Sequence, residues 1–208
     1  MRRRSLLIGG AAVAVLAGLG LPGSPAAWAA STEDMLKDRV LGKADAPVTI
    51  IEYASFTCPH CATFHVETLP HLKKEYLDTG KAKLIFRDFP FDEPALRASM
   101  LARCMPTERY FPVVETLFKS QNQWAKEKDA TANLARIGKL AGMSDADFKT
   151  CMANNALMDG ILKVRLDGEK NFGVQSTPTF IINDKNKISG NQPAAEFDKV
   201  IKPLLPKS

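Results

Sequence analysis

Two cysteines separated by two residues follow a predicted strand and open a predicted helix. Segment 47–55 is rich in β-branched and aromatic residues, which predicts a buried strand. A long helix is expected to begin near Cys58 and to end by Gly80, with a kink at Pro70 because proline donates no backbone hydrogen bond. The motif Cys58-Pro59-His60-Cys61 therefore lies at the junction of a strand and a helix, and this junction constrains both the fold and the chemistry.

A cysteine at a helix N-terminus faces unpaired backbone N–H groups and the positive end of the helix dipole. Both favour the thiolate, so we expect the pKa of Cys58 to be lowered. Pro59 suits the first helical turn, His60 can supply a donor or a positive charge, and Cys61 lies within disulfide reach. A stabilised thiolate is a good leaving group, so the pair should hold its disulfide weakly and donate it, with Cys58 attacking and Cys61 resolving.

The remaining pattern predicts a fold that mixes helices and strands. A helical stretch is expected over 92–171, with breaks at Pro106, near Asp129 and at Gly142, and a capping box at Ser144 that starts one of its helices. The other predicted elements are a brief helix and lead-in over 31–46, strands at 81–88, 179–183 and 187–189, and a last helix over 193–205.

Residues 1–29 have the build of an export signal, with a basic start, an apolar run and the small-residue sequence Ala27-Trp28-Ala29 at the end. Arg3-Arg4 also resembles a twin-arginine export motif, and an uncleaved anchor is the alternative. Cleavage near Ala29 removes three of the 28 Lys and Arg residues and none of the 23 acidic ones, which leaves a charge of only +2. A nearly neutral domain gives no electrostatic reason to expect nucleic-acid binding.

The segment Ile51-Glu52-Tyr53-Ala54-Ser55-Phe56-Thr57-Cys58-Pro59-His60-Cys61 resembles the active-site segment of the DsbA family, the periplasmic thiol:disulfide oxidants of bacteria. The resemblance extends over most of 45–205. It implies a thioredoxin-like domain over 30–91 and 172–208, interrupted by an inserted helical domain over 92–171. It also implies a monomeric periplasmic enzyme without a cofactor, which oxidises reduced exported proteins and is reoxidised by a DsbB-like membrane oxidase.

Two further site residues depend on this resemblance. Pro178 is expected to be a cis-proline facing the two cysteines, with the Thr177 backbone pairing with a substrate peptide. Thr at this position is more usual in periplasmic isomerases, so an isomerase or reductase stays open, although the separate N-terminal domain of those isomerases is not expected here. Glu52 matches a buried acid that exchanges a proton with Cys61; a Glu paired with a nearby Lys or exposed at an edge is the alternative.

Cys104 and Cys151 both fall in the helical block, 47 positions apart. In an oxidising compartment we expect them to form a structural disulfide, as some DsbA branches have, and a second redox pair lacks a helix-start motif. Metal binding is not expected, because Cys58, Cys61 and His65 are the only compact candidates and a closed zinc site needs four ligands. A zinc- or peptide-binding module without turnover is the remaining alternative, and His65 and His71 are expected to be solvated.

Overall fold

The computed structural model describes residues 30–127 and 129–206. The predicted signal peptide, its twin-arginine motif and the cleavage site near Ala29 fall on residues 1–29 and lie outside the described residues. Within the described ranges, no helix is both long enough and apolar enough to cross a membrane.

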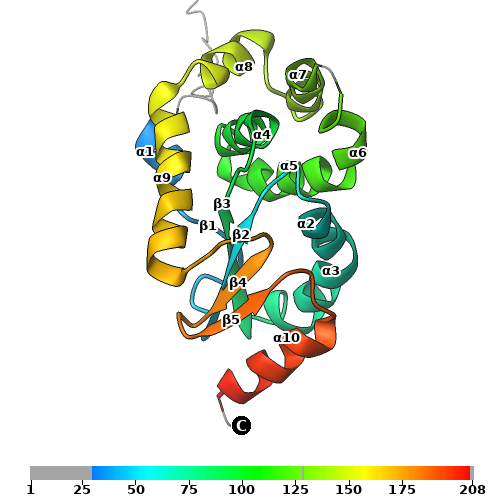
Figure 1. Ribbon diagram of the computed structural model, residues 1–208, viewed down its shortest axis with the longest axis vertical. Helices are drawn as coiled ribbons and strands as arrows, with labels where there is room; N and C mark the ends of the chain where they lie inside the picture. Colours follow the sequence, from blue (N-terminus) through cyan, green and yellow to red (C-terminus); the bar gives the residue numbers. More distant parts are fainter. Residues whose placement is uncertain (1–29, 128, 207–208) are drawn as a thin grey trace, which may run out of the picture.

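The described residues form a five-stranded mixed sheet with the strand order β1-β3-β2-β4-β5 (Figure 1). Its strands are β1 (Arg39–Gly42), β2 (Val48–Ala54), β3 (Ala82–Asp88), β4 (Thr179–Ile182) and β5 (Asn186–Ser189). β2 and β3 are parallel, while every other neighbouring pair is antiparallel. A parallel pair needs a crossover connection, and the helical segment after β2 supplies it.

Strand β1 was not predicted from the sequence, which indicated only a helix and a lead-in for 31–46. The helix is present as α1 (Thr32–Leu36), capped by the Ser31 hydroxyl, which accepts from the N–H of Asp34 at 3.1 Å. β1 has only four residues, alternates between partly buried and exposed positions, and pairs along one edge of the sheet. A strand of four residues is too short for alternation of hydrophobicity to distinguish it from a loop.

The long helix after β2 is not a regular α-helix. It consists of α2 (Pro59–Thr63), the π-helical turn η1 (Phe64–Thr68), α3 (Leu69–Leu72) and a second π-helical turn η2 (Lys73–Leu77). The two wide turns lie on either side of Pro70, where the backbone donor is missing. Gly80 adopts a positive φ of 75° after this segment, as expected of a residue that ends a helix.

The two faces of the sheet are covered by different helices (Figure 1). Val48, Ile50 and Ala54 of β2 belong to the main hydrophobic core, which includes α2 and α3. The alternate residues Ile51 and Tyr53 point to the other face, into a second cluster that packs beneath α9 (Asn155–Phe172). At the C-terminus, α10 (Ala194–Ile201) and the 3-10 turn η3 (Lys202–Leu204) pack on the α3 side.

The predicted helical stretch is present, and its breaks are confirmed. Its helices before α9 are α4 (Glu93–Arg103), α5 (Thr107–Lys119), α6 (Gln121–Trp124), α7 (Ala130–Leu140) and α8 (Asp145–Met152). Pro106 and Asp129 are the N-cap residues of α5 and α7, and Gly142 follows α7 with a φ of 89°. The hydroxyl of Ser144 accepts from the Asp147 N–H at 3.1 Å at the start of α8, as the capping box predicts.

Helix α9 joins this block to the sheet without a break. Leu157 and Ile161 near its start lie in the main core, whereas Gly168 near its end lies against the ring of Tyr53. A Cβ at Gly168 would come within 2.5 Å of that ring, so only glycine allows this close approach. A buried ion pair, with 2.7 Å between Arg103 Nε and Asp88 Oδ2, also joins α4 to β3.

Candidate active site

Cys58 and Cys61 carry free thiols at the start of α2. Cys58 is the N-cap residue and is partly exposed, and its carbonyl oxygen accepts from the N–H groups of Cys61 and Ala62 at 3.1 and 3.2 Å. Cys61 is completely buried one turn further along. Pro59 is the first residue of the helix, a position at which its missing N–H leaves no helical bond unmade. One thiol therefore faces solvent while the other faces the protein interior.

The two thiols have opposite pKa shifts. The hydrogen bond from the Cys61 thiol is the main cause that lowers the pKa of Cys58 to about 5, and burial opposes it. The Thr177 side chain and the backbone N–H groups of Cys61 and His60 lower it further. Burial is the main cause that raises the pKa of Cys61, followed by the nearby Cys58 thiolate and then the charge of Glu52. The expected direction for Cys58 is confirmed, but the neighbouring thiol contributes more than the helix N-terminus.

His60 lies on the surface beside Cys58, with an exposed side chain. Its contribution to the lowered pKa of Cys58 comes through its backbone N–H. The predicted help from its ring, as a donor or a positive charge, stays a prediction.

The segment before β4 brings Thr177 and Pro178 to the same place. The peptide bond between them is cis, and the carbonyl oxygen of Thr177 lies 3.4 Å from Cys58 Sγ, close enough to accept from the thiol form. The carbonyl of Pro178 accepts from the N–H of Gly190 at 2.8 Å, and the Thr179 hydroxyl donates to the carbonyl of Ser176 at 2.7 Å. These bonds hold the turn before β4 beside the exposed sulfur.

Glu52 is completely buried in β2, and its partner is a histidine. His65 Nε2 lies 3.0 and 3.1 Å from the two carboxylate oxygens. The alternatives of a lysine partner or an edge-exposed Glu52 are therefore wrong, and so is the expectation that His65 is solvated. His65 stacks on Phe118 at 4.1 Å, because it lies four residues after Cys61 and points inward with it. His71 is 38% exposed and contacts Asp198 at 3.1 Å.

Gln121 in α6 is a site residue that the sequence did not reveal. Its buried side-chain amide donates to the carbonyl oxygens of Phe56 and Cys58 at 2.7 and 3.0 Å. A second contact from the helical block joins the Thr57 hydroxyl to Asp92 at 2.8 Å. Neither contact has a local sequence signal, since each joins the loop before α2 to a residue at least 35 positions away. The helical block thus fixes the loop that carries Cys58.

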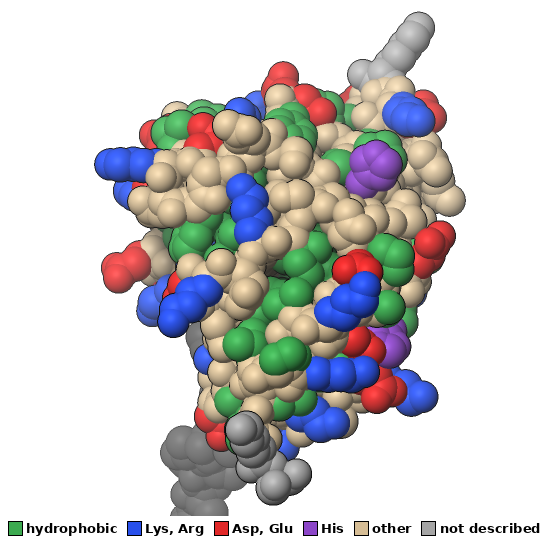
Figure 2. All heavy atoms as spheres, turned by 60° about the horizontal axis from the view of Figure 1, so that its bottom comes forward, with side chains coloured by type: hydrophobic (Ala, Val, Ile, Leu, Met, Phe, Trp, Pro, Cys, Tyr) green, Lys and Arg blue, Asp and Glu red, His purple; other side chains and the backbone are tan. Residues whose placement is uncertain are grey.

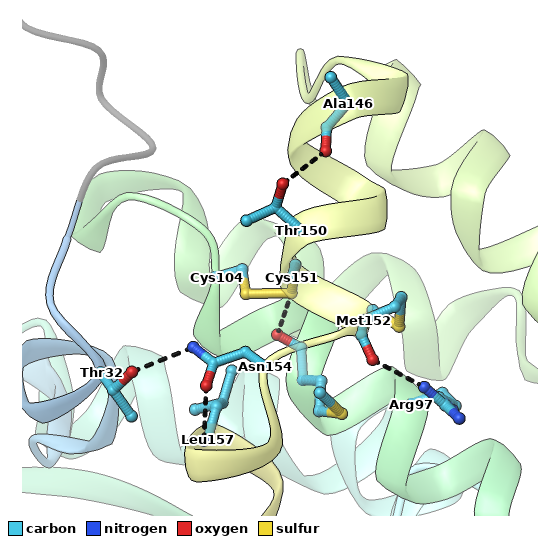
Figure 3. Close-up of a disulfide and its surroundings, with 10 residues drawn as sticks. Thr32, Arg97, Cys104, Ala146, Thr150, Cys151, Met152, Asn154 and Leu157 are labelled. Carbon is cyan, nitrogen blue, oxygen red and sulfur yellow. Dashed lines mark hydrogen bonds between the residues drawn. A yellow bond between two sulfur atoms is a disulfide. The ribbon is translucent and has the colours of Figure 1, made fainter.

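Cys104 and Cys151 are joined by a disulfide between the end of α4 and α8 (Figure 3). The Cα atoms lie 6.2 Å apart, and both residues are buried. In the same region, the Arg97 guanidinium donates to the carbonyl oxygen of Met152 at 2.9 Å, and the Asn154 amide donates to Thr32 at 3.0 Å. The disulfide lies within the helical block, away from the sheet.

Metal ligands are not clustered in the described part of the chain, where no group of three or more His, Cys, Asp and Glu side chains could hold an ion.

On the face shown in Figure 2, Lys and Arg side chains are interspersed with Asp and Glu around apolar surface, so the two signs of charge do not separate there.

Comparison with known proteins now adds to this geometry. A family model described as thioredoxin matches residues 34–203. The crystal structure of Wolbachia pipientis alpha-DsbA1 is similar, with a TM-score of 0.74 and 35% sequence identity, over 81% of this chain and 90% of that one. The chain belongs to the DsbA family of thioredoxin-like disulfide oxidoreductases. The predicted thioredoxin-like fold with a helical insertion is confirmed.

Curated relatives of this DsbA-family chain have names that refer to the same chemistry. A Rickettsia bellii protein named for protein-disulfide oxidoreductase activity is 31% identical over 172 residues, which cover 79% of this chain and 64% of that protein. Disulfide bond formation protein D of Bacillus subtilis is 28% identical over 152 residues, covering 70% of this chain and 68% of that protein. The match to the Rickettsia conorii relative covers only 53% of its length, so the chain spans between about half and two thirds of the rickettsial relatives.

Proposed function

We propose that this chain is a thiol:disulfide oxidoreductase that donates a Cys58–Cys61 disulfide to reduced substrate proteins. The observation that supports this most is the asymmetry of the two thiols at the start of α2. Cys58 is accessible and has a pKa of about 5, whereas Cys61 is buried and has a raised pKa. An accessible sulfur that is stable as a thiolate is the better leaving group and the point of attack.

In the proposed reaction, a substrate thiolate attacks Cys58 Sγ of the oxidised protein. A bond forms between the two sulfurs, the Cys58–Cys61 bond breaks, and Cys61 leaves as a thiolate that takes up a proton. A second substrate thiolate then attacks the substrate sulfur, and Cys58 leaves as a thiolate. The substrate loses two electrons and gains a disulfide, and the protein gains the two electrons and becomes a dithiol.

The direction of transfer follows from the same groups. The Cys61 thiol, the Thr177 side chain and two backbone N–H groups stabilise the Cys58 thiolate, and these contacts exist only in the reduced form. Stabilising the reduced form makes the disulfide easier to donate. We therefore propose Cys58 as the attacked sulfur, Cys61 as the resolving thiol, and Pro59, His60 and Glu52 as supporting residues.

The substrate is proposed to lie as an extended peptide along the turn that contains Thr177 and Pro178. The Thr177 carbonyl lies 3.4 Å from Cys58 Sγ, so a peptide paired with the Thr177 backbone would bring its cysteine to that sulfur. Pro178 has no N–H and does not compete for the sulfur. We propose reduced exported proteins in the periplasm as the substrates, a DsbB-like membrane oxidase as the source of new disulfides, and a monomer as the active form.

Incubation of the oxidised protein with a reduced, unfolded substrate tests this function. One equivalent of protein should remove two equivalents of substrate thiol, following the stoichiometry of one disulfide for two thiols. Cys58→Ser should abolish the exchange. Cys61→Ser, given substrate whose cysteines are joined in disulfides, should accumulate mixed disulfides, because Cys58 attacks a substrate disulfide, a substrate thiolate leaves, and no second thiol resolves the product. A wild-type protein that leaves the substrate thiols intact would contradict the proposal.

An isomerase or reductase is a second candidate, because Thr177 occupies the position before the cis-proline. The two functions differ in the redox state that the cell maintains. Trapping the thiols of Cys58 and Cys61 in cells with an alkylating reagent should find mainly the disulfide if the chain is an oxidant. A mainly dithiol population would instead favour the isomerase or reductase.

A further inference from the structure

Glu52 and His65 form a buried pair, and the histidine of this pair also lines a groove. We propose that His65 is a positioning residue that passes protons between Glu52 and solvent, so that buried Cys61 gains and loses its proton through a groove that Cys58 does not line. This inference rests on the proposed thiol:disulfide exchange and adds a residue and a route to it.

Cys61 and His65 both lie on the inner side of the helical segment after β2. They lie four residues apart on one helical segment, and both are buried. Glu52 is on the face of β2 that this segment covers, and both of its oxygens lie within 3.1 Å of His65 Nε2. The charge of Glu52 also acts on the Cys61 thiol. The carboxylate is therefore coupled to the resolving sulfur and to the histidine.

His65 lies beside a groove that gives access to solvent. A groove of about 520 Å³ lies between β1, the η1–η2 segment and α5. His65 lines this groove together with Leu41, Leu69, Phe111, Pro112 and Glu115. The Glu52 side chain is 0% exposed and the His65 side chain is 4% exposed, so His65 is the member of the pair that meets the groove. A water-sized space beside an imidazole is where a proton can enter or leave.

The buried thiol of Cys61 needs such a route for its proton. Cys61 is 0% exposed, yet it must gain a proton when it leaves the mixed disulfide and lose one when it attacks to close the disulfide. Burial and the Cys58 thiolate raise the pKa of Cys61, so the thiol does not ionise without a base. A carboxylate coupled to it, with a histidine behind that carboxylate, supplies this base and its path to water.

Other ionisable groups surround this route, and a test of His65 must leave them unsubstituted. They are Cys58 on α2, Tyr110 and Glu115 on α5, Lys73 and Lys74 on η2, Asp78 after it, and the Arg103–Asp88 pair beyond Tyr110. Substitution of His65 alone leaves all of them in place. His71 is a matched control, because it belongs to the same helical segment and also contacts a carboxylate, that of Asp198, but lies away from this route.

The experiment follows closure of the disulfide in the reduced protein mixed with oxidised glutathione. At high concentration, Cys58 forms the mixed disulfide quickly, and the observed rate is that of Cys61 losing its proton and attacking Cys58 Sγ as glutathione leaves. His65→Gln retains a hydrogen-bond donor for Glu52 but cannot transfer a proton. We expect it to slow closure by at least ~10-fold and to flatten the dependence of the rate on pH. Added imidazole should restore the rate of His65→Ala, and His71→Gln should close like wild type.

Two results would overturn the inference. One is His65→Gln closing at the wild-type rate with the wild-type pH profile. The other is slow closure that retains this profile and does not respond to imidazole in His65→Ala, which indicates a purely structural role. If the His65 variants do not fold, Glu52→Gln takes their place and must show the same loss. Wild-type protein that never closes its disulfide would instead contradict the proposed function, so the two failures are distinguishable.

Discussion

The side-chain amide of Gln121 donates to the carbonyl oxygen of Cys58 at 3.0 Å, across 63 positions of the sequence. The same amide donates to the carbonyl of Phe56 at 2.7 Å. A single residue of the helical block thus satisfies two backbone acceptors in the loop that presents the exposed thiol. The bond to Phe56 is buried and the bond to Cys58 is partly buried, so water does not easily replace the amide.

Replacement of Gln121 by alanine should therefore destabilise the protein. Two carbonyl oxygens lose their donor, and we expect the free energy of unfolding to fall by about 1–3 kcal/mol. Urea unfolding of Gln121→Ala measures this loss. Gln123→Ala is the matched control, because Gln123 is exposed on the same short helix. Equal stability of the two variants would contradict the assigned contact.

The largest single cause of the low pKa of Cys58 is the thiol of Cys61. Titration of the thiolate absorbance in Cys61→Ala should therefore give a midpoint well above the value of about 5 expected for the wild-type dithiol. Cys61→Ser retains a hydroxyl donor and should titrate between the two. If Cys61→Ala titrates like wild type, the helix N-terminus must be the dominant cause instead.

The same shift makes the stability of the reduced protein depend on pH. The pKa of Cys58 is about 5 in the folded state and 9.0 for an ordinary thiol, so between these values the unfolded chain binds more protons. Stability contributed by this thiolate is therefore fully present above pH 9 and is lost as the pH falls toward 5. We expect the melting temperature of the reduced form, relative to the oxidised form, to rise from pH 5 to pH 8. A constant difference would argue against a thiolate at Cys58.

Thr177→Val removes a hydroxyl while keeping the shape of the side chain. This hydroxyl is buried and has no hydrogen-bond partner among the described residues. It belongs to the side chain that lowers the pKa of Cys58. The variant should titrate at a higher pH than wild type and should fold at least as stably, because a buried polar group is lost. Thiolate titration and thermal unfolding check the two outcomes. An unchanged titration midpoint would show that the Thr177 hydroxyl does not affect the pKa of Cys58.

The disulfide between Cys104 and Cys151 is proposed to stabilise the helical block without taking part in exchange. It closes a loop of 47 positions, and loss of both sulfurs in the double alanine variant should cost about 3–4 kcal/mol of unfolding free energy. The exchange rate at Cys58 should remain close to wild type, because neither sulfur lies at the start of α2. Urea unfolding and a thiol-exchange assay measure the two effects. Loss of exchange in a folded variant would indicate instead that Cys104 and Cys151 form a second redox pair.

Local patterns predicted most of the fold. The β-branched and aromatic residues of β2, the capping box at Ser144 and the breaks at Pro106 and Gly142 each depend on residues close together in the chain, and each predicted feature is present. The resemblance to the DsbA family supplied the insertion and the role of Pro178, which no local pattern contains.

The features that the sequence did not reveal depend on distant contacts. Gln121 is one of many polar residues in a helical stretch until the fold places it above Cys58. His65 was expected to be solvated, because the helix pattern does not reveal that a buried carboxylate faces it from β2. The π-helical turns around Pro70 also change the register that a regular helix would have given.

Helix α9 spans 18 residues without interruption, from the core of the helical block to the tight contact between Gly168 and Tyr53 behind the sheet. One continuous helix therefore connects the sheet to the helical block, which holds the loop of Cys58 through Gln121.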